Sequence, residues 1–201
     1  IGLLPFANAE RNALTTATAG ERAVTTGTPQ SAGDDRWRIP VAVRTRIFGT
    51  VKGDVVVPVA QDGDVKRIVW KPRLVFPGLR DGERLTRVTR MPERGTLTAR
   101  DGTVLAEGEA RTSAVPDVAS QVVGRLGPVA AEDAARVNAL GVPSDAQVGT
   151  TGLERIFDDR LGGRASGTLL AGRRVLARAN GQRGERVRTT IDPGLERTAT
   201  A

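Results

Sequence analysis

In one stretch of the first third of the chain, residues 36–44, every second residue is large and apolar. A period of two predicts a half-buried β-strand. The side chains on its predicted apolar face are Trp37, Ile39, Val41 and Val43. Two more apolar runs predict strands at 53–59 and 65–70, joined by a turn at Asp62-Gly63. The proline-rich residues 72–77 should end this antiparallel meander, because proline cannot donate to a strand ladder.

Strands are also predicted near both ends of the chain. Residues 167–170 and 175–179 read as a hairpin about Ala171-Gly172, because glycine tolerates the positive φ of tight turns. A last strand is predicted at 185–190. Residues 1–35 are rich in threonine, glycine and turn residues, and we expect one strand and loops there.

Helices are predicted between these strand regions. Residues 116–126 and 130–140 have helical spacing and are followed by glycine. A third helix is indicated by apolar residues at i, i+3, i+4 and i+8 over 153–161. Asp192 is a natural N-cap and Pro193 a natural first helical residue, so a last helix should begin there. Strands and short helices in segregated runs predict an α+β fold.

The residue counts exclude much of enzyme chemistry. The 201-residue chain has no cysteine and no histidine, so thiolate zinc sites, cysteine nucleophiles, imidazole bases and Ser-His-Asp triads are all impossible. We expect neither a cofactor nor a metal site. No run of eighteen apolar residues predicts a membrane span. The first residue is Ile1, and we expect a membrane anchor upstream of it.

The net charge of +7 raises the question of nucleic-acid binding. Only three of the 30 basic residues are lysine, and the arginines are scattered among 23 acids. A nucleic-acid module more often clusters its cations beside stacking aromatics, whereas Trp37 and Trp70 stand far apart in sequence. We therefore expect no nucleic-acid partner and attribute the arginine bias to coding preference.

A hairpin predicted in residues 94–106 carries a more specific signal. Residues 96–99 should pair with 103–106 around a two-residue turn at Asp101-Gly102. The same stretch resembles the opening motif of the non-catalytic module of class B penicillin-binding proteins, Arg-Gly-x-x-x-x-Arg-x-Gly-x-x-Leu-Ala. The matching residues are Arg94, Gly95, Arg100, Gly102, Leu105 and Ala106.

Four other stretches resemble motifs of the same family, in the same order. The first, Trp70 to Pro77, resembles the end of a transport-factor-like N-terminal domain. The others lie at 115–124, at 149–154 and at 189–196, where the family has its hinge into the transpeptidase domain. The chain departs from the family pattern at Ala99, Val115 and Glu196.

The resemblance implies two domains. Residues 1–79 would form a short antiparallel sheet of a partial transport-factor-like domain. Residues 80–201 would form a mixed, hairpin-rich pedestal domain with several short helices, cut at the start of the transpeptidase domain.

The resemblance also implies structural and interface residues. They are Arg94, Gly95, Arg100, Asp101, Gly102, Gly149, Gly152, Glu154, Thr190 and Asp192. We expect Arg94 to pair with Glu154, with their side chains within about 6 Å. The alternative is a capping box, in which Thr151 and Glu154 satisfy backbone N–H groups at a helix start and Arg94 is solvated.

The implied function is that of a non-catalytic pedestal. Penicillin-binding transpeptidases use Ser-x-x-Lys, Ser-x-Asn and Lys-Thr-Gly, and none of these strings occurs in the chain. The implied partners are a transpeptidase domain of the same parent chain, cell-wall synthesis or division proteins, and the membrane through the upstream anchor. The implied location is the extracytoplasmic face of the bacterial membrane.

Two other functions are open on the residues alone. A hydrolase could use the carboxylate pairs Asp34-Asp35, Glu132-Asp133 or Asp158-Asp159, but adjacent residues diverge on a strand or helix and nothing separates their pKa values. A free-standing scaffold or ligand-binding protein could use the sheet of residues 36–70 as a cradle.

Overall fold

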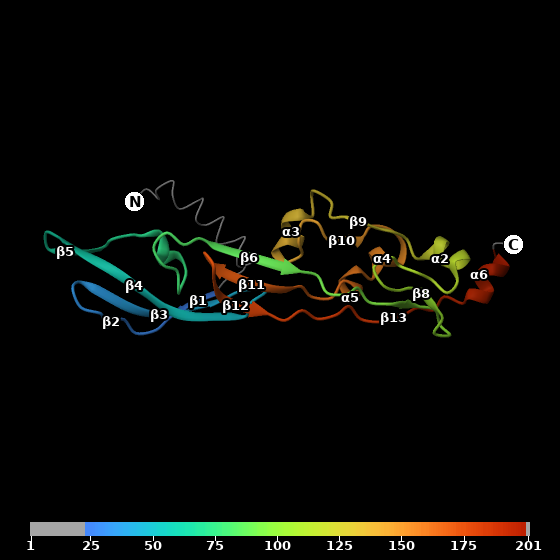
Figure 1. Ribbon diagram of the computed structural model, residues 1–201, viewed down its shortest axis with the longest axis horizontal. Coiled ribbons are helices and arrows are strands. Elements are labelled where there is room, and N and C mark those ends of the chain that lie inside the picture. The colour runs from blue at the N-terminus through green and yellow to red at the C-terminus, as the bar shows by residue number, and fades with distance from the viewer. Residues whose placement is uncertain (1–22, 200–201) are drawn as a thin grey trace. The chain divides into compact units, whose positions relative to one another are not determined.

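The computed structural model describes residues 23–199, and they form an α+β fold of mostly antiparallel sheets and short helices (Figure 1). The chain divides into two compact units. The first contains the described residues up to Val88 together with Gly167–Ala179, and the second contains Thr89–Ser166 and the described residues from Asn180 onward. No helix in 23–199 is long and apolar enough to cross a membrane.

A five-stranded antiparallel sheet dominates the first unit. Its strands are β1 (Ala23–Thr26), β2 (Gln30–Ser31), β3 (Arg36–Arg44), β4 (Thr50–Asp62) and β5 (Val65–Ile68). The order is β1-β3-β4-β5, and β2 also pairs with β3. The predicted meander of three strands is therefore confirmed, and β3 has the bounds expected from its alternation. β4 is longer than predicted because it pairs with β3 from Arg36↔Pro58 to Arg44↔Thr50.

The second sheet of this unit was only partly predicted. It has the order β12-β11-β6, with β6 at Leu85–Arg90, β11 at Ser166–Ala171 and β12 at Arg174–Ala179. β6 was not predicted, nor was the short 3-10 helix η1 (Pro72–Val75). The core of the unit is built from six buried side chains of both sheets and their connections: Val43, Phe48, Val51, Phe76, Leu85 and Leu169.

Both predicted two-residue turns of this unit are displaced by one residue. Asp62 pairs with Val65, so the first turn is Gly63-Asp64. Ala171 pairs with Arg174, so the second is Gly172-Arg173. In each turn the glycine takes the first central position, at φ +62 and +57 respectively, which is where a positive φ is needed.

The second unit contains a three-stranded sheet, a pair of short strands and five short helices. The order of one sheet is β13-β7-β8, with β7 at Leu97–Thr98, β8 at Val104–Ala106 and β13 at Val187–Arg188, parallel to β7. A separate pair joins β9 (Leu126–Pro128) to β10 (Gln147–Gly149). The helices are α2 (Pro116–Val122), α3 (Ala134–Ala139), α4 (Gly152–Ile156), α5 (Asp158–Leu161) and α6 (Pro193–Ala199).

The predicted hairpin at 94–106 is present with a wider loop than expected. Gly102 N donates to Ala99 O at 3.1 Å, and Ala99 N donates to Thr103 O at 2.8 Å. Those bonds enclose three residues, Arg100 to Gly102, and Gly102 has φ +93. This is the three-residue arrangement in which a turn is followed by a glycine bulge, so the predicted two-residue turn was wrong.

All three helices predicted between the hairpins are shorter than expected. The one predicted at 116–126 ends at Val122, because Gly124 takes φ +84 and residues 126–128 pair as β9 instead. The one predicted at 130–140 is reduced to α3. The one predicted at 153–161 is divided into α4 and α5 at Phe157, whose ψ of 17° departs from helical values.

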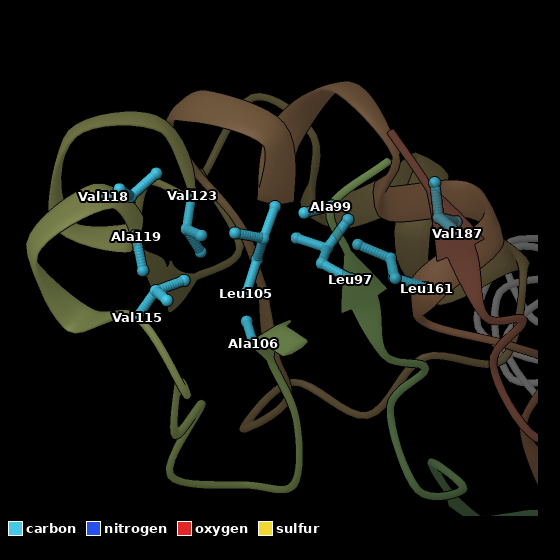
Figure 2. Close-up of a cluster of buried hydrophobic side chains, with 10 residues drawn as sticks. All are labelled: Leu97, Ala99, Leu105, Ala106, Val115, Val118, Ala119, Val123, Leu161 and Val187. Carbon is cyan, nitrogen blue, oxygen red and sulfur yellow. The ribbon is translucent and has the colours of Figure 1, made fainter. Parts of the chain in front are cut away.

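The core of the second unit is small and aliphatic, as the low aromatic content implies. Figure 2 shows its ten buried side chains, contributed by the β7–β8 hairpin, α2, α5 and β13. They are Leu97, Ala99, Leu105, Ala106, Val115, Val118, Ala119, Val123, Leu161 and Val187. Leu161, the last residue of α5, is fully buried. This anchors the α4–α5 segment, which carries the candidate site.

Candidate functional site: a buried arginine–carboxylate cluster

Glu154 is a carboxylate buried in the second unit, with only 1% of its surface exposed. It lies in the first turn of α4, where its backbone N donates to Val123 O at 2.9 Å. Burial of an ionised carboxylate is costly unless the charge is paired and hydrogen-bonded. Its partners therefore decide what this residue does.

Arg94 is the first partner and reaches Glu154 from the segment that precedes β7. Its Nε donates to Glu154 Oε2 at 2.8 Å. Its Nη2 donates to Asp158 Oδ1 at 2.7 Å and to the backbone O of Glu154 at 3.3 Å. One guanidinium thus ties the side chain and backbone of α4 to the first residue of α5.

Arg111 is the second partner and binds the other carboxylate oxygen. Its Nε donates to Glu154 Oε1 at 2.8 Å, and its Nη1 donates to Gly95 O at 2.9 Å. Arg111 lies in a tight loop closed by reciprocal backbone bonds between Glu107 and Thr112. Its φ is +51, which costs a residue other than glycine about 1–2 kcal/mol. The ion pair with Glu154 and the hydrogen bond to Gly95 O offset that cost.

Asp158 completes the group, which we call the arginine–carboxylate cluster: Arg94, Arg111, Glu154 and Asp158. Asp158 Oδ1 accepts from Arg94 and also from Gly149 N, at 2.7 Å. Two cations meet two anions, so the cluster is neutral. Each oxygen of Glu154 accepts a guanidinium hydrogen bond, one from Arg94 and one from Arg111, so this carboxylate joins the two arginine segments.

The glycines beside Glu154 allow backbones to approach closely. A Cβ on Gly149 would lie 2.0 Å from Glu154 O. Gly152 has φ +59, and a Cβ there would lie 2.7 Å from Gly124 Cα. Neither position has room for a side chain. This explains the two glycines of the 149–154 motif, which a capping box alone leaves unexplained.

The predicted ion pair between Arg94 and Glu154 is present, and the capping box is not. Thr151 makes no side-chain cap at the start of α4. Its Oγ1 instead accepts from Arg125 N at 3.0 Å. The alternative of a solvated Arg94 is also wrong, since only 10% of that side chain is exposed.

Of the predicted residues outside the cluster, Arg100 and Asp192 lie close together at the start of α6. Arg100 Nη1 lies 3.7 Å from Asp192 Oδ2, and Arg100 N donates to Ile191 O at 2.9 Å. Asp192 caps α6 as predicted, with Oδ1 accepting from Gly194 N at 3.0 Å. In the turn, hydrogen bonding to Thr103 lowers the pKa of Asp101. Gly102 bends this turn, Gly95 supplies its carbonyl to the cluster, and Thr190 is exposed.

Two members of the cluster were not predicted as site residues. Asp158 follows Glu154 by four residues, so helical spacing could have placed both on one side of a helix. It was considered only as a neighbour of Asp159. No pattern near Arg111 marks it, because its role depends on a contact across 43 positions of sequence.

Comparison with known proteins finds one family to which part of the chain is similar. No curated protein matches the chain. Residues 107–189 match the family model of the penicillin-binding protein dimerisation domain. The matched span contains Arg111, Glu154 and Asp158 but begins after Arg94. The segment that holds most of the cluster is thus similar to a non-catalytic region of penicillin-binding proteins.

Proposed function

We propose that the chain is the non-catalytic pedestal of a penicillin-binding protein and positions a D,D-transpeptidase domain for peptidoglycan cross-linking. The observation that carries this proposal is the family match over residues 107–189. The cluster supports it physically, because a buried network of opposite charges ties together the segments that it joins. A support for another domain needs such rigidity more than it needs a cleft.

Contacts at α6 add a second line of support. Asp192 caps the helix, and Arg197 Nε donates to Asp117 Oδ2 of α2 at 2.7 Å. The helix is therefore held at its start by a cap and in its last turn by an ion pair. In the family, the motif around 189–196 leads into the transpeptidase domain. A fixed α6 would give that domain a defined orientation.

The finer parts of the proposal follow from the family resemblance. The parent chain is anchored at the extracytoplasmic face of the bacterial membrane by a segment upstream of Ile1. The pedestal offers surfaces to cell-wall synthesis or division proteins. The strands of 36–70 belong to a partial transport-factor-like domain that precedes the pedestal.

The test identifies the native protein in its source. An antibody raised against the 201-residue chain recovers the protein from membranes, and its mass and labelling by a fluorescent penicillin are measured. We expect a membrane band far above 21.2 kDa that takes the label. The isolated chain serves as control and should remain unlabelled, because it lacks Ser-x-x-Lys.

An unlabelled band near 21.2 kDa would contradict the proposal. That result would favour the second candidate, a free-standing extracytoplasmic scaffold or ligand-binding protein without a transpeptidase domain.

A further inference from the structure

β5 and the three residues that follow it have an unusual composition. All seven residues from 65 to 71 are either large and apolar or cationic, and none is acidic: Val65, Lys66, Arg67, Ile68, Val69, Trp70 and Lys71. Every one of them is exposed. Ile68 and Trp70 leave 63% and 57% of their surfaces in solvent. Packing among the described residues of the first unit therefore does not account for these apolar side chains.

Trp37 lies on the same face of the sheet as Ile68, whereas Val65 and Arg67 lie on the other face. It pairs with Val57 on β4, while Val59 pairs with Ile68 on β5. A further bond from Val69 N to Pro58 O at 2.9 Å continues that register, which puts Trp70 opposite Val57. Directly opposed residues share one face of a sheet. The two tryptophans therefore flank the buried Val57, and Trp37 is 38% exposed.

We propose that residues 65–71 and Trp37, called here the β5 surface, bind the surface of an anionic lipid bilayer. Tryptophan and aliphatic side chains partition into the interface between headgroups and acyl chains. Lysine and arginine beside them are attracted by anionic headgroups. Lys66 and Lys71 flank Ile68, Val69 and Trp70 in sequence and are both solvent-exposed, whereas Arg67 pairs with Asp62 at 2.6 Å. Charge and apolar area therefore lie together at the β5 edge of the sheet, on both of its faces.

Two other occupants fit the β5 surface less well. A second copy pairing along the free edge of β5 would bring its own Lys66, Arg67 and Lys71 against these cations, and charges on an edge strand oppose such pairing. A glycan could stack on the tryptophans, but it would leave Val65, Ile68 and Val69 without a role. A lipid surface uses both the aliphatic and the cationic residues.

This inference goes beyond the pedestal proposal and can fail separately. Vesicle binding by the β5 surface requires no transpeptidase domain and no penicillin labelling. Conversely, a labelled parent protein would say nothing about lipid contact.

The experiment uses the intrinsic fluorescence of the full chain with vesicles. Trp37 and Trp70 are its two tryptophans, so tryptophan emission reports only on this surface. With vesicles of equal parts phosphatidylglycerol and phosphatidylcholine, we expect a blue shift, reduced acrylamide quenching and co-sedimentation. Phosphatidylcholine vesicles alone should bind several-fold more weakly.

Variants separate the β5 surface from general basicity. The double substitution Lys66→Gln and Lys71→Gln should weaken binding to the anionic vesicles by on the order of tenfold or more. Ile68→Ser should weaken it as well and reduce the blue shift. The matched controls are Lys52→Gln, the remaining lysine, and Val88→Ser, an apolar residue of the first unit that is 63% exposed. Both controls should bind the anionic vesicles as tightly as the unsubstituted chain does.

Three results would overturn the inference. One is that acrylamide fails to quench the tryptophan emission of the monomeric chain without vesicles, because other residues of the same chain would then cover the surface. Another is equal loss of binding in the control and β5 variants. The third is concentration-dependent association, or a response to soluble glycan strands, without any response to vesicles.

Discussion

Arg94 and Glu154 are separated by 60 positions in sequence, yet Arg94 Nε lies 2.8 Å from Glu154 Oε2 in the interior of the second unit. Arg111 binds the opposite oxygen of the same carboxylate. Three chain segments therefore converge on one buried anion. A buried ion pair is poor evidence of net stability. Removing one partner, however, is strongly destabilising, because it leaves the other charge buried without compensation. That asymmetry makes the cluster testable.

Glu154→Gln should destabilise the second unit by about 3–5 kcal/mol, because two guanidinium groups would remain buried beside a neutral amide. Urea unfolding of the variant and of the unsubstituted chain measures this difference. Glu109→Gln provides the matched control, since Glu109 is exposed, and it should change stability by no more than about 0.5 kcal/mol. A Glu154→Gln variant as stable as the control would contradict a structural role for the contacts of Glu154 with the two arginines.

A double-mutant cycle should separate the buried ion pair from the exposed one. Alanine substitutions at Arg94 and Glu154 should show a coupling energy of about 1–3 kcal/mol, because the residues share one buried network. The same cycle on Arg100 and Asp192, whose charged atoms are 3.7 Å apart with 61% and 36% of the side chains exposed, should give less than about 1 kcal/mol. Equal couplings would mean that burial adds nothing to the Arg94–Glu154 contact.

Local patterns predicted β3, β4, β5, β11 and β12 but not β6, β9 or β10. The alternation in 36–44 predicted β3 in full, since a shift of one residue would have exposed its apolar set. Turns were less predictable. Three glycine turns were misplaced by one residue or widened, because several registers satisfy the same glycine and only cross-strand packing selects one.

Long-range contacts set the limit of prediction at the site. Helical spacing alone could not show that Gly124 packs against the backbone at Thr151, an approach that ends α2 early. Arg111 lies in a loop without apolar periodicity, so nothing local marks its side chain as buried. The Arg94–Glu154 pair was predictable only through the family resemblance, which supplied the long-range pairing.

Gly149→Ala should disrupt the site without removing any charge. The added Cβ would lie 2.0 Å from Glu154 O, so the backbone of α4 would have to move and the hydrogen bond from Gly149 N to Asp158 would lengthen. We expect destabilisation of at least about 2 kcal/mol, measured by urea unfolding, as for other overpacked interiors. Gly194→Ala in α6 meets only Asp192 Oδ1, at 3.3 Å, and should be neutral or slightly stabilising, because alanine is favoured in helices. Similar losses in both variants would contradict a specific role for Gly149.

Acid should weaken the first unit through Glu83. Arg174 donates to both carboxylate oxygens of Glu83, at 2.8 and 2.6 Å, and this hydrogen bonding lowers the pKa of Glu83 from an ordinary 4.5 to about 2. A carboxyl with a lower pKa in the folded state stabilises the fold above its unfolded pKa. That contribution should be lost as the pH falls from about 4.5 to 2. Glu83→Gln should be less stable than the unsubstituted chain at neutral pH, and the two stabilities should become similar near pH 2. The midpoints of urea unfolding measure both. In Arg174→Met, the loss of stability between pH 4.5 and pH 2 should be smaller. If the stabilities of Glu83→Gln and of the unsubstituted chain fall in parallel from pH 5 to pH 2, this linkage is ruled out.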